Sequence, residues 1–95
     1  MRVVPATAAP AGLAEIARRV DARMLDLLEG EIQYWSDADC ELTDPLSALR
    51  DLVLAGGKRL RPAFCHWAFV GAGGDADEPL VIDAGAAIEL LHTFA

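Results

Sequence analysis

An amphipathic pattern across residues 11–35 constrains the fold more than any other feature of the chain. Apolar side chains recur there at steps of three and four residues, and charged side chains lie off the stripe that they form. The apolar positions are Leu13, Ile16, Ala17, Val20, Met24, Leu27, Leu28, Ile32 and Trp35. Because an α-helix has about 3.6 residues per turn, this spacing predicts one long helix that buries a single face.

Proline and glycine mark the next helix. Residues 36–43 are polar and predict a loop. Asp44 is expected to cap the helix that follows and Pro45 to occupy its first position, where a missing N–H leaves no hydrogen bond unmade. That helix should end at the glycine pair 56–57.

Two further helices follow the same logic. Pro62 is expected to open a third helix, which the glycine-rich residues 71–74 end. An acidic cap at residues 77–78, followed by Pro79, should begin a fourth helix that continues to the last residue. The chain is therefore predicted to be all-α, with about four helices.

The fourth predicted helix is apolar around its whole circumference. Across residues 80–95 only Asp83 and Glu89 are charged, and His92 is the one other strongly polar side chain. Such a helix is typical of a position buried on all sides, which three short or amphipathic helices can hardly provide. We therefore expect the chain to be an interrupted portion of a larger helical domain.

The composition narrows the class of protein. The chain has 95 residues, 54% of them hydrophobic, and a formal net charge of −7, which indicates one globular domain at most and excludes a nucleic-acid surface. No apolar run is long enough for a membrane span or a signal sequence. Two cysteines, Cys40 and Cys65, are too few for a disulfide framework, so a protein of the reducing cytoplasm is predicted. The spacing of these cysteines also indicates no metal site. Residues 1–10, rich in proline and alanine, are predicted to form a flexible arm.

A small cationic cluster interrupts this acidic sequence at residues 56–62, which read Gly-Gly-Lys-Arg-Leu-Arg-Pro. In a helical turn, Lys58 and Arg61 would project to the same side, beside the free N–H groups at the start of a helix. Arg59 would point elsewhere and either pair with an acid or face solvent. The cluster predicts a site for a compact multivalent anion, although a solvated basic patch is the common alternative.

Two stretches of the sequence resemble a known family. The Gly-Gly-Lys-Arg-Leu-Arg-Pro segment resembles the first signature of the trans-isoprenyl diphosphate synthases, or polyprenyl synthetases. Residues 86–95, Ala-Ala-Ile-Glu-Leu-Leu-His-Thr-Phe-Ala, resemble the segment just before the first aspartate-rich motif of that family. The resemblance covers roughly residues 11–95 and implies the N-terminal part of an isoprenoid-synthase helical bundle, similar to geranylgeranyl and farnesyl diphosphate synthases.

The resemblance implies a substrate site. Lys58, Arg61 and His92 occupy the positions that bind the diphosphate of isopentenyl diphosphate in the family. Without the resemblance, His92 on an apolar helix would be read as a core histidine. Glu89 is expected to be structural, pairing with a basic group or capping a carbonyl.

The family's metal site is expected to lie outside this chain. The resemblance implies Mg²⁺ bound by aspartate pairs that would follow Ala95, so residues 11–95 are expected to be a partial domain, truncated before the first aspartate-rich motif. Such a chain is expected to be inactive alone, without catalytic or metal-binding residues of its own. The full-length family implies a homodimer. Asp37 with Asp39, and Asp75 with Asp77, have the spacing of metal ligands but are interpreted as loop and cap acids.

Phe94 and Ala95 occupy positions that form the floor of the chain-elongation pocket in relatives. A large residue followed by a small one resembles short-chain synthases, with geranylgeranyl diphosphate favoured as the product. The alternative for Phe94 is an aromatic core residue.

A function from another class remains open. The chain could be a non-catalytic all-helical module that binds an anion or a partner protein. Cooperative thermal unfolding of a soluble monomer would favour that module, whereas a fragment that exposes its fourth helix should aggregate or stay molten.

Overall fold

The computed structural model describes residues 11–94, with Phe94 described by its backbone alone, and over this range the chain is all-α. The elements are α1 (Leu13–Ala38), a 3-10 turn η2 (Cys40–Leu42), α2 (Thr43–Leu54), α3 (Leu60–Gly71) and α4 (Pro79–Phe94). The predicted all-α fold with four helices is confirmed within these residues. The predicted arm at residues 1–10 lies outside them.

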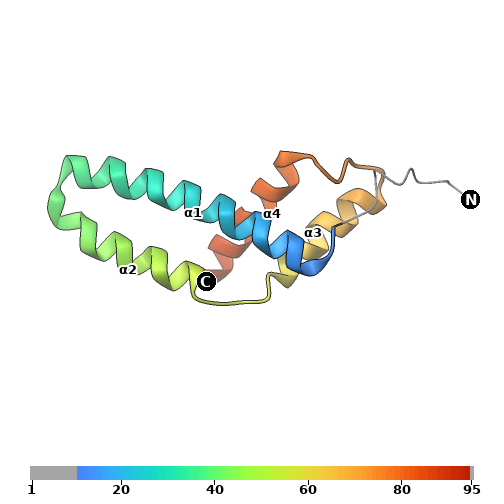
Figure 1. Cartoon of the computed structure of the whole chain (residues 1–95), viewed down its shortest axis with the longest axis horizontal. Coiled ribbons are helices and arrows are strands. Elements are labelled where there is room, and N and C mark those ends of the chain that lie inside the picture. Colours follow the sequence, from blue (N-terminus) through green and yellow to red (C-terminus); the bar gives the residue numbers. More distant parts are fainter. Residues whose placement is uncertain (1–10, 95) are drawn as a thin grey trace, which may run out of the picture.

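The helices form an elongated molecule with extents of 58 × 21 × 19 Å. Helices α1 and α2 run antiparallel as a long hairpin, and α3 and α4 pack beside the N-terminal half of α1 (Figure 1). The tip of the hairpin extends away from α3 and α4. No helix within residues 11–94 is long and apolar enough to cross a membrane.

The hydrophobic core lies where all four helices meet. It is formed by six buried residues, three of them spaced one helical turn apart on α1, as the predicted stripe requires. These residues are Ile16, Val20, Met24, Val53, Ala63 and Ala86. The far end of the stripe is less covered, because only α2 and the short η2 turn pack on it among the described residues, and Trp35 is 45% exposed.

The start of α2 differs from the prediction. The helix begins at Thr43, so Asp44 lies in its first turn and is not its cap. The reason is the η2 turn, in which the Asp39 side chain accepts a hydrogen bond of 3.0 Å from the Glu41 N–H. This turn leads directly into α2, and together with the extension of α1 to Ala38 it replaces most of the predicted loop. Pro45 is still in the first turn, where its missing N–H breaks no helical hydrogen bond.

The later helix boundaries are close to those predicted. Helix α2 ends at Leu54, just before the glycine pair, and α3 ends at Gly71. Helix α4 starts at Pro79, and the side chain of Glu78 accepts a hydrogen bond of 3.3 Å from the Leu80 N–H, as an acidic cap should.

Helix α4 is not buried on all sides by the described residues. Val81 and Ala86 face the core, whereas Leu80 and Leu91 are 70% and 72% exposed. The physical reason is that α4 packs mainly against α3 and α1, and two helices cover only part of its circumference. This exposure agrees with the expectation that the other three helices can hardly enclose the fourth.

Helices α3 and α4 approach each other closely at Gly85. A Cβ atom at this position would lie 2.9 Å from Cβ of Pro62 and 3.3 Å from its Cα. Real Cβ atoms essentially never show the shorter of these distances. The absence of a side chain at Gly85 therefore allows α4 to pack against the first turn of α3.

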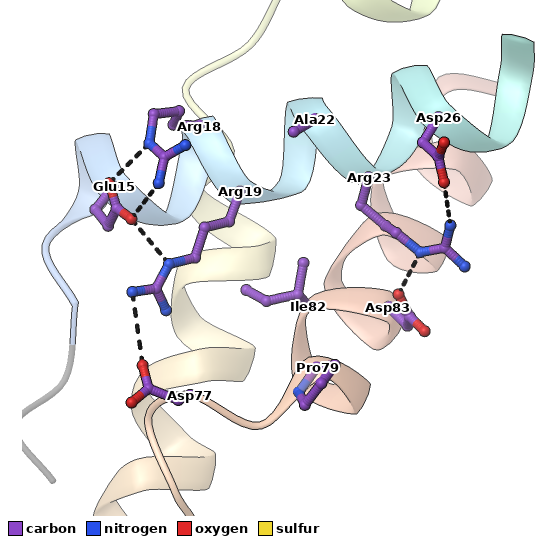
Figure 2. A pocket seen from close by; sticks show the side chains of 10 residues that line it. All are labelled: Glu15, Arg18, Arg19, Ala22, Arg23, Asp26, Asp77, Pro79, Ile82 and Asp83. Atoms are coloured by element: carbon purple, nitrogen blue, oxygen red, sulfur yellow. Dashed lines mark hydrogen bonds and ion pairs between the residues drawn. The ribbon is translucent and has the colours of Figure 1, made fainter.

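Ion pairs fasten α1 to α4 and to the segment before it (Figure 2). Arg23 donates a hydrogen bond of 2.6 Å from Nε to Asp83 on α4 and also pairs with Asp26. Arg19 pairs with Glu15 at 2.9 Å and donates to the Ala76 carbonyl at 3.1 Å. These contacts hold the polar edge of α1 against the segment that leads into α4.

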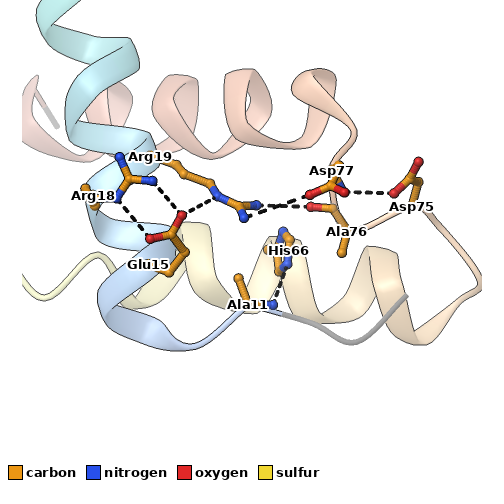
Figure 3. Close-up of polar contacts among 8 residues, drawn as sticks. All are labelled: Ala11, Glu15, Arg18, Arg19, His66, Asp75, Ala76 and Asp77. Atoms are coloured by element: carbon orange, nitrogen blue, oxygen red, sulfur yellow. Dashed lines mark hydrogen bonds and ion pairs between the residues drawn. The ribbon is translucent and has the colours of Figure 1, made fainter. Parts of the chain in front are cut away.

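His66 and Trp67 on α3 hold the backbone of Ala11. The fully buried His66 accepts a hydrogen bond of 3.2 Å at Nε2 from the Ala11 N–H (Figure 3), and the Trp67 indole donates one of 2.8 Å to the Ala11 carbonyl. Both side chains therefore anchor Ala11, which precedes α1, to α3. Burial and the nearby Arg19 guanidinium lower the pKa of His66 below its ordinary value, so the neutral imidazole is the stable form in the fold.

Acid should destabilise the fold through His66. As the pH falls below about 6.5, the unfolded chain gains a proton on this imidazole that the folded chain excludes. The free energy of unfolding should then fall by at most about 1.4 kcal/mol per pH unit for this one proton. Urea denaturation at several pH values measures the slope. The variant His66→Gln keeps an acceptor for Ala11 but cannot titrate, and an equally steep slope in it would contradict the assignment.

Candidate anion-binding site

The connection between α2 and α3 has an unusual backbone. Gly57 has a φ of +102°, and Arg59, which caps the N-terminus of α3, has φ 60° and ψ 37°. A non-glycine residue in this left-handed conformation costs roughly 1–2 kcal/mol. The turn must therefore be held in place by contacts with the rest of the fold.

Arg59 supplies these contacts. Its guanidinium donates hydrogen bonds to Asp21 on α1 (2.6 Å), to Glu89 on α4 (3.1 Å) and to the Val53 carbonyl near the end of α2 (3.2 Å). The Arg59 and Glu89 side chains are only 4% and 7% exposed, whereas Asp21 is 47% exposed. The prediction that Arg59 pairs with an acid is confirmed, and the solvent-facing alternative is wrong. The structural role expected for Glu89 is confirmed by the same ion pair.

Lys58 and Arg61 flank this buried arginine and are both exposed. Of the seven lysine and arginine residues within residues 11–94, they are the two that form no ion pair with another described residue. The other five, which each pair with at least one carboxylate, are Arg18, Arg19, Arg23, Arg50 and Arg59. The two uncompensated cations of the described chain therefore lie three residues apart, at one helix start.

Lys58 and Arg61 do not share a helical turn, contrary to the sequence-based expectation. Lys58 lies in the turn before α3, and Arg61 is the second residue of the helix. The left-handed Arg59 between them interrupts the helical path. Helix α3 starts without a side-chain cap, so its first N–H groups and the positive end of its dipole are available to an anion beside Arg61.

His92 lies one helical turn beyond Glu89 on α4. The two residues are three apart on α4 and therefore lie on adjacent turns of the same side. Glu89 contacts Arg59 directly, and its carboxylate oxygen lies 3.9 Å from the point where a Cβ of Gly57 would be. His92 is exposed, so the described residues do not bury it as a core histidine. The ion pair thus brings the turn with Lys58 against the last turns of α4, which carry His92.

A second charged region, the groove between α1 and α4 in Figure 2, is a weaker candidate for an anion. The groove has a volume of about 690 Å³ and is lined by Arg18, Arg19 and Arg23 together with acidic residues. Its arginines are all neutralised by ion pairs, and hydrogen bonds from Arg18 and Arg19 lower the pKa of Glu15 to about 2. The ion pairs therefore join the two helices, and within the described residues the groove leaves no uncompensated positive charge for an anion.

The predicted loop and cap acids have structural partners. The Asp75 side chain accepts a hydrogen bond of 2.9 Å from the Asp77 N–H, and Asp37 accepts one of 2.9 Å from Gln33. Among the residues that the structure describes, no group of three or more His, Cys, Asp or Glu side chains is arranged to hold a metal ion. Ala95 and the Phe94 side chain, predicted to form a chain-length pocket, lie outside the described residues.

Curated relatives support the resemblance seen in the two motifs. The chain is 42% identical over 62 residues to geranylgeranyl pyrophosphate synthase 4 of Arabidopsis thaliana, a match that covers 62% of this chain and 16% of that protein. It is 32% identical over 74 residues to the short chain isoprenyl diphosphate synthase of Methanocaldococcus jannaschii, which covers 78% of this chain and 21% of the relative. The heterodimeric geranylgeranyl pyrophosphate synthase large subunit 1 of Arabidopsis thaliana, a chloroplastic protein, is 39% identical over 62 residues. This match covers 62% of this chain and 16% of that protein.

Two other comparisons are negative. No protein-family model matches the chain, and no solved structure matches it. The chain spans only about one sixth to one fifth of the length of the curated relatives named above. The matches nevertheless extend over more than half of this chain at 32–42% identity, and all three relatives are prenyl diphosphate synthases by name. The chain is therefore similar, over the residues matched, to the trans-isoprenyl diphosphate synthases.

Proposed function

We propose that this chain carries the isopentenyl diphosphate site of a short-chain prenyltransferase, which condenses isopentenyl diphosphate with an allylic diphosphate in isoprenoid biosynthesis. One observation carries the proposal. Lys58 and Arg61 are the two cations without a carboxylate partner in the described chain, and they are also the two that the family signature assigns to the diphosphate. The names of the relatives favour geranylgeranyl diphosphate as the product.

The residues of this chain would bind and orient the substrate. The Arg61 guanidinium would donate two parallel hydrogen bonds to one phosphate, and the Lys58 ammonium would act as a mobile point charge. His92 would add a third donor from α4. Each charge-assisted hydrogen bond contributes on the order of 1.5–3 kcal/mol. The acceptor's diphosphate is retained in the condensation, so it must be held and neutralised without being activated.

Departure of the allylic diphosphate requires a different site. Within the family resemblance, Mg²⁺ on aspartate pairs would supply the positive charge that stabilises this leaving group. Residues 11–94 hold no group of three or more His, Cys, Asp or Glu side chains arranged for such an ion, and their proposed part is to bind the acceptor substrate. We therefore propose that residues 11–95 are a partial domain that binds the acceptor substrate and is inactive alone.

Product length, assembly and compartment belong to the same proposal. Phe94 and Ala95 would lie at the floor of the elongation pocket and limit the product. A homodimer is proposed for the full-length enzyme. Cytoplasm remains the proposed compartment, although one of the relatives named above is chloroplastic.

The test is a calorimetric titration of the protein with isopentenyl diphosphate. Replacing Lys58 with alanine should raise the dissociation constant by about tenfold or more, because it removes one charge-assisted contact. Arg18→Ala is the matched control, since this exposed arginine is paired with Glu15 and should not contact the ligand. Equal affinities of the wild type and Lys58→Ala would sink the proposed site.

A non-catalytic module remains the second candidate because of the exposed apolar surface of α3 and α4. Phe64, Leu80 and Leu91 are 62–72% exposed, a pattern that suits a partner-binding surface as well as an incomplete core. Sedimentation and thermal unfolding separate the two possibilities. A soluble monomer that unfolds cooperatively would favour the module.

A further inference from the structure

Arg59 lies between the two cations of the site but faces the interior of the fold. Its three hydrogen-bond partners come from three different helices, α1, α2 and α4. We propose that Arg59 is a positioning residue, which fixes the turn that presents Lys58 and Arg61 to a diphosphate. This inference rests on the proposed function, because it assigns a role within the same anion site.

The left-handed backbone conformation of Arg59 supports this positioning role. Its left-handed conformation is unfavourable for a residue with a side chain, so it persists only when the surroundings over-determine it. Lys58 immediately precedes this residue, and Arg61 follows it by two. A change of φ and ψ at Arg59 would rotate Lys58 relative to Arg61. The directions of both cations therefore depend on how firmly the Arg59 side chain is held.

The guanidinium is held firmly enough for this task. Only 4% of the side chain is exposed, and its fork reaches Asp21, Glu89 and a backbone carbonyl at 2.6–3.2 Å. Gly57 leaves room for it, because a Cβ there would lie 3.1 Å from an Arg59 nitrogen. Gly57 also has a positive φ, so a side chain at that position would be strained as well as crowded.

The carboxylates that pair with Arg59 also support this role. Asp21 and Glu89 lie next to a site that is proposed to bind an anion, and free carboxylates there would repel a diphosphate. Arg59 neutralises part of this charge by pairing with both carboxylates. Without Arg59, Glu89 would be a nearly buried carboxylate that has lost its ion-pair partner. Replacing Arg59 should therefore weaken anion binding, even though Arg59 itself does not touch the ligand.

The test compares variants of the whole chain in titrations with isopentenyl diphosphate. Arg59→Lys keeps the positive charge but loses the planar fork that reaches three acceptors. We expect its dissociation constant to rise about tenfold or more, because small displacements of binding groups have large effects. Val70→Ala is the control for lost stability. Val70 is buried near the other end of α3, so this variant should melt earlier and bind with unchanged affinity.

A spectroscopic measurement keeps the test decisive if Arg59→Lys does not fold. Asp21 is about half exposed and lies on α1, so Asp21→Asn should leave the chain folded. We expect this variant to weaken binding and to shift the backbone amide resonances of residues 57–61 before any ligand is added. The resonances of the hairpin tip, residues 30–45, should stay in place.

The outcomes separate the two proposals. Unchanged affinity in folded Arg59→Lys and Asp21→Asn variants, together with weakened binding by Lys58→Ala, would overturn the positioning role and leave the anion site standing. No binding of isopentenyl diphosphate to the wild-type chain would overturn both. Weakened binding by all three variants, with Val70→Ala unchanged, would support both.

Discussion

Replacing Glu89 with alanine is expected to lower the free energy of unfolding by about 3–5 kcal/mol, which is the usual effect of removing one partner of a buried ion pair. The guanidinium of Arg59 would stay buried without the carboxylate that now lies 3.1 Å from it. Asp21 and the Val53 carbonyl would still accept hydrogen bonds from Arg59, so the loss should lie near the lower end of this range. Small domains have only about 5–15 kcal/mol of stability in total, and the variant should be close to unfolding.

Urea denaturation measures this effect, and Glu29→Ala provides a matched control. Glu29 also pairs with an arginine, Arg50, at 2.7 Å, but its side chain is 51% exposed. Exposed pairs contribute about 1 kcal/mol or less, so this control should unfold almost like the wild type. Equal losses in Glu89→Ala and Glu29→Ala would contradict the claim that the Arg59–Glu89 pair is the buried link between the turn and α4.

Replacing Gly85 with valine should have the second-largest effect on stability. The close approach of α4 to Pro62 leaves no space for a side chain, and overpacking of this kind costs about 1–3 kcal/mol. Part of the obstacle is the Pro62 backbone, which cannot move without shifting the start of α3. The variant should therefore unfold at lower urea concentration and also disturb the turn before α3.

Gly30 offers a matched control within a helix. It lies on α1, and a Cβ there would meet nothing within 4 Å. Valine is a slightly better helix former than glycine, by a few tenths of a kcal/mol, so Gly30→Val should be neutral or weakly stabilising. If Gly85→Val were tolerated as well as Gly30→Val, the close packing of α3 on α4 would be wrong.

Local sequence patterns predicted the helices because each depends on short-range rules. The apolar steps of residues 11–35 identified α1, and the glycine pair 56–57 identified the end of α2. The start of α2 was missed by two residues, because the competing η2 turn depends on a hydrogen bond that the Asp39 side chain accepts from the Glu41 N–H and that no periodicity reveals. The incomplete cover of α4 was expected, because three short or amphipathic helices cannot surround a helix that is apolar on every side.

The candidate site was only partly predictable. Lys58 and Arg61 were singled out by the motif, and the structure adds independently that they have no carboxylate partner within residues 11–94. Arg59 has the same charge and lies between them, yet its side chain is buried. Its partner Asp21 is 38 residues away in the sequence, at the polar edge of the α1 stripe. No local pattern connects two such residues, so the support of the turn became visible only in three dimensions.

The most direct test of the proposed anion site is a titration of the wild-type chain with isopentenyl diphosphate, in which backbone amide NMR locates the residues that bind it. The account predicts that the largest shifts occur at residues 57–61 and 89–93, in the turn before α3 and the last turns of α4. Shifts centred on Arg18, Arg19 and Arg23, in the groove between α1 and α4, or no saturable shifts at all, would contradict it.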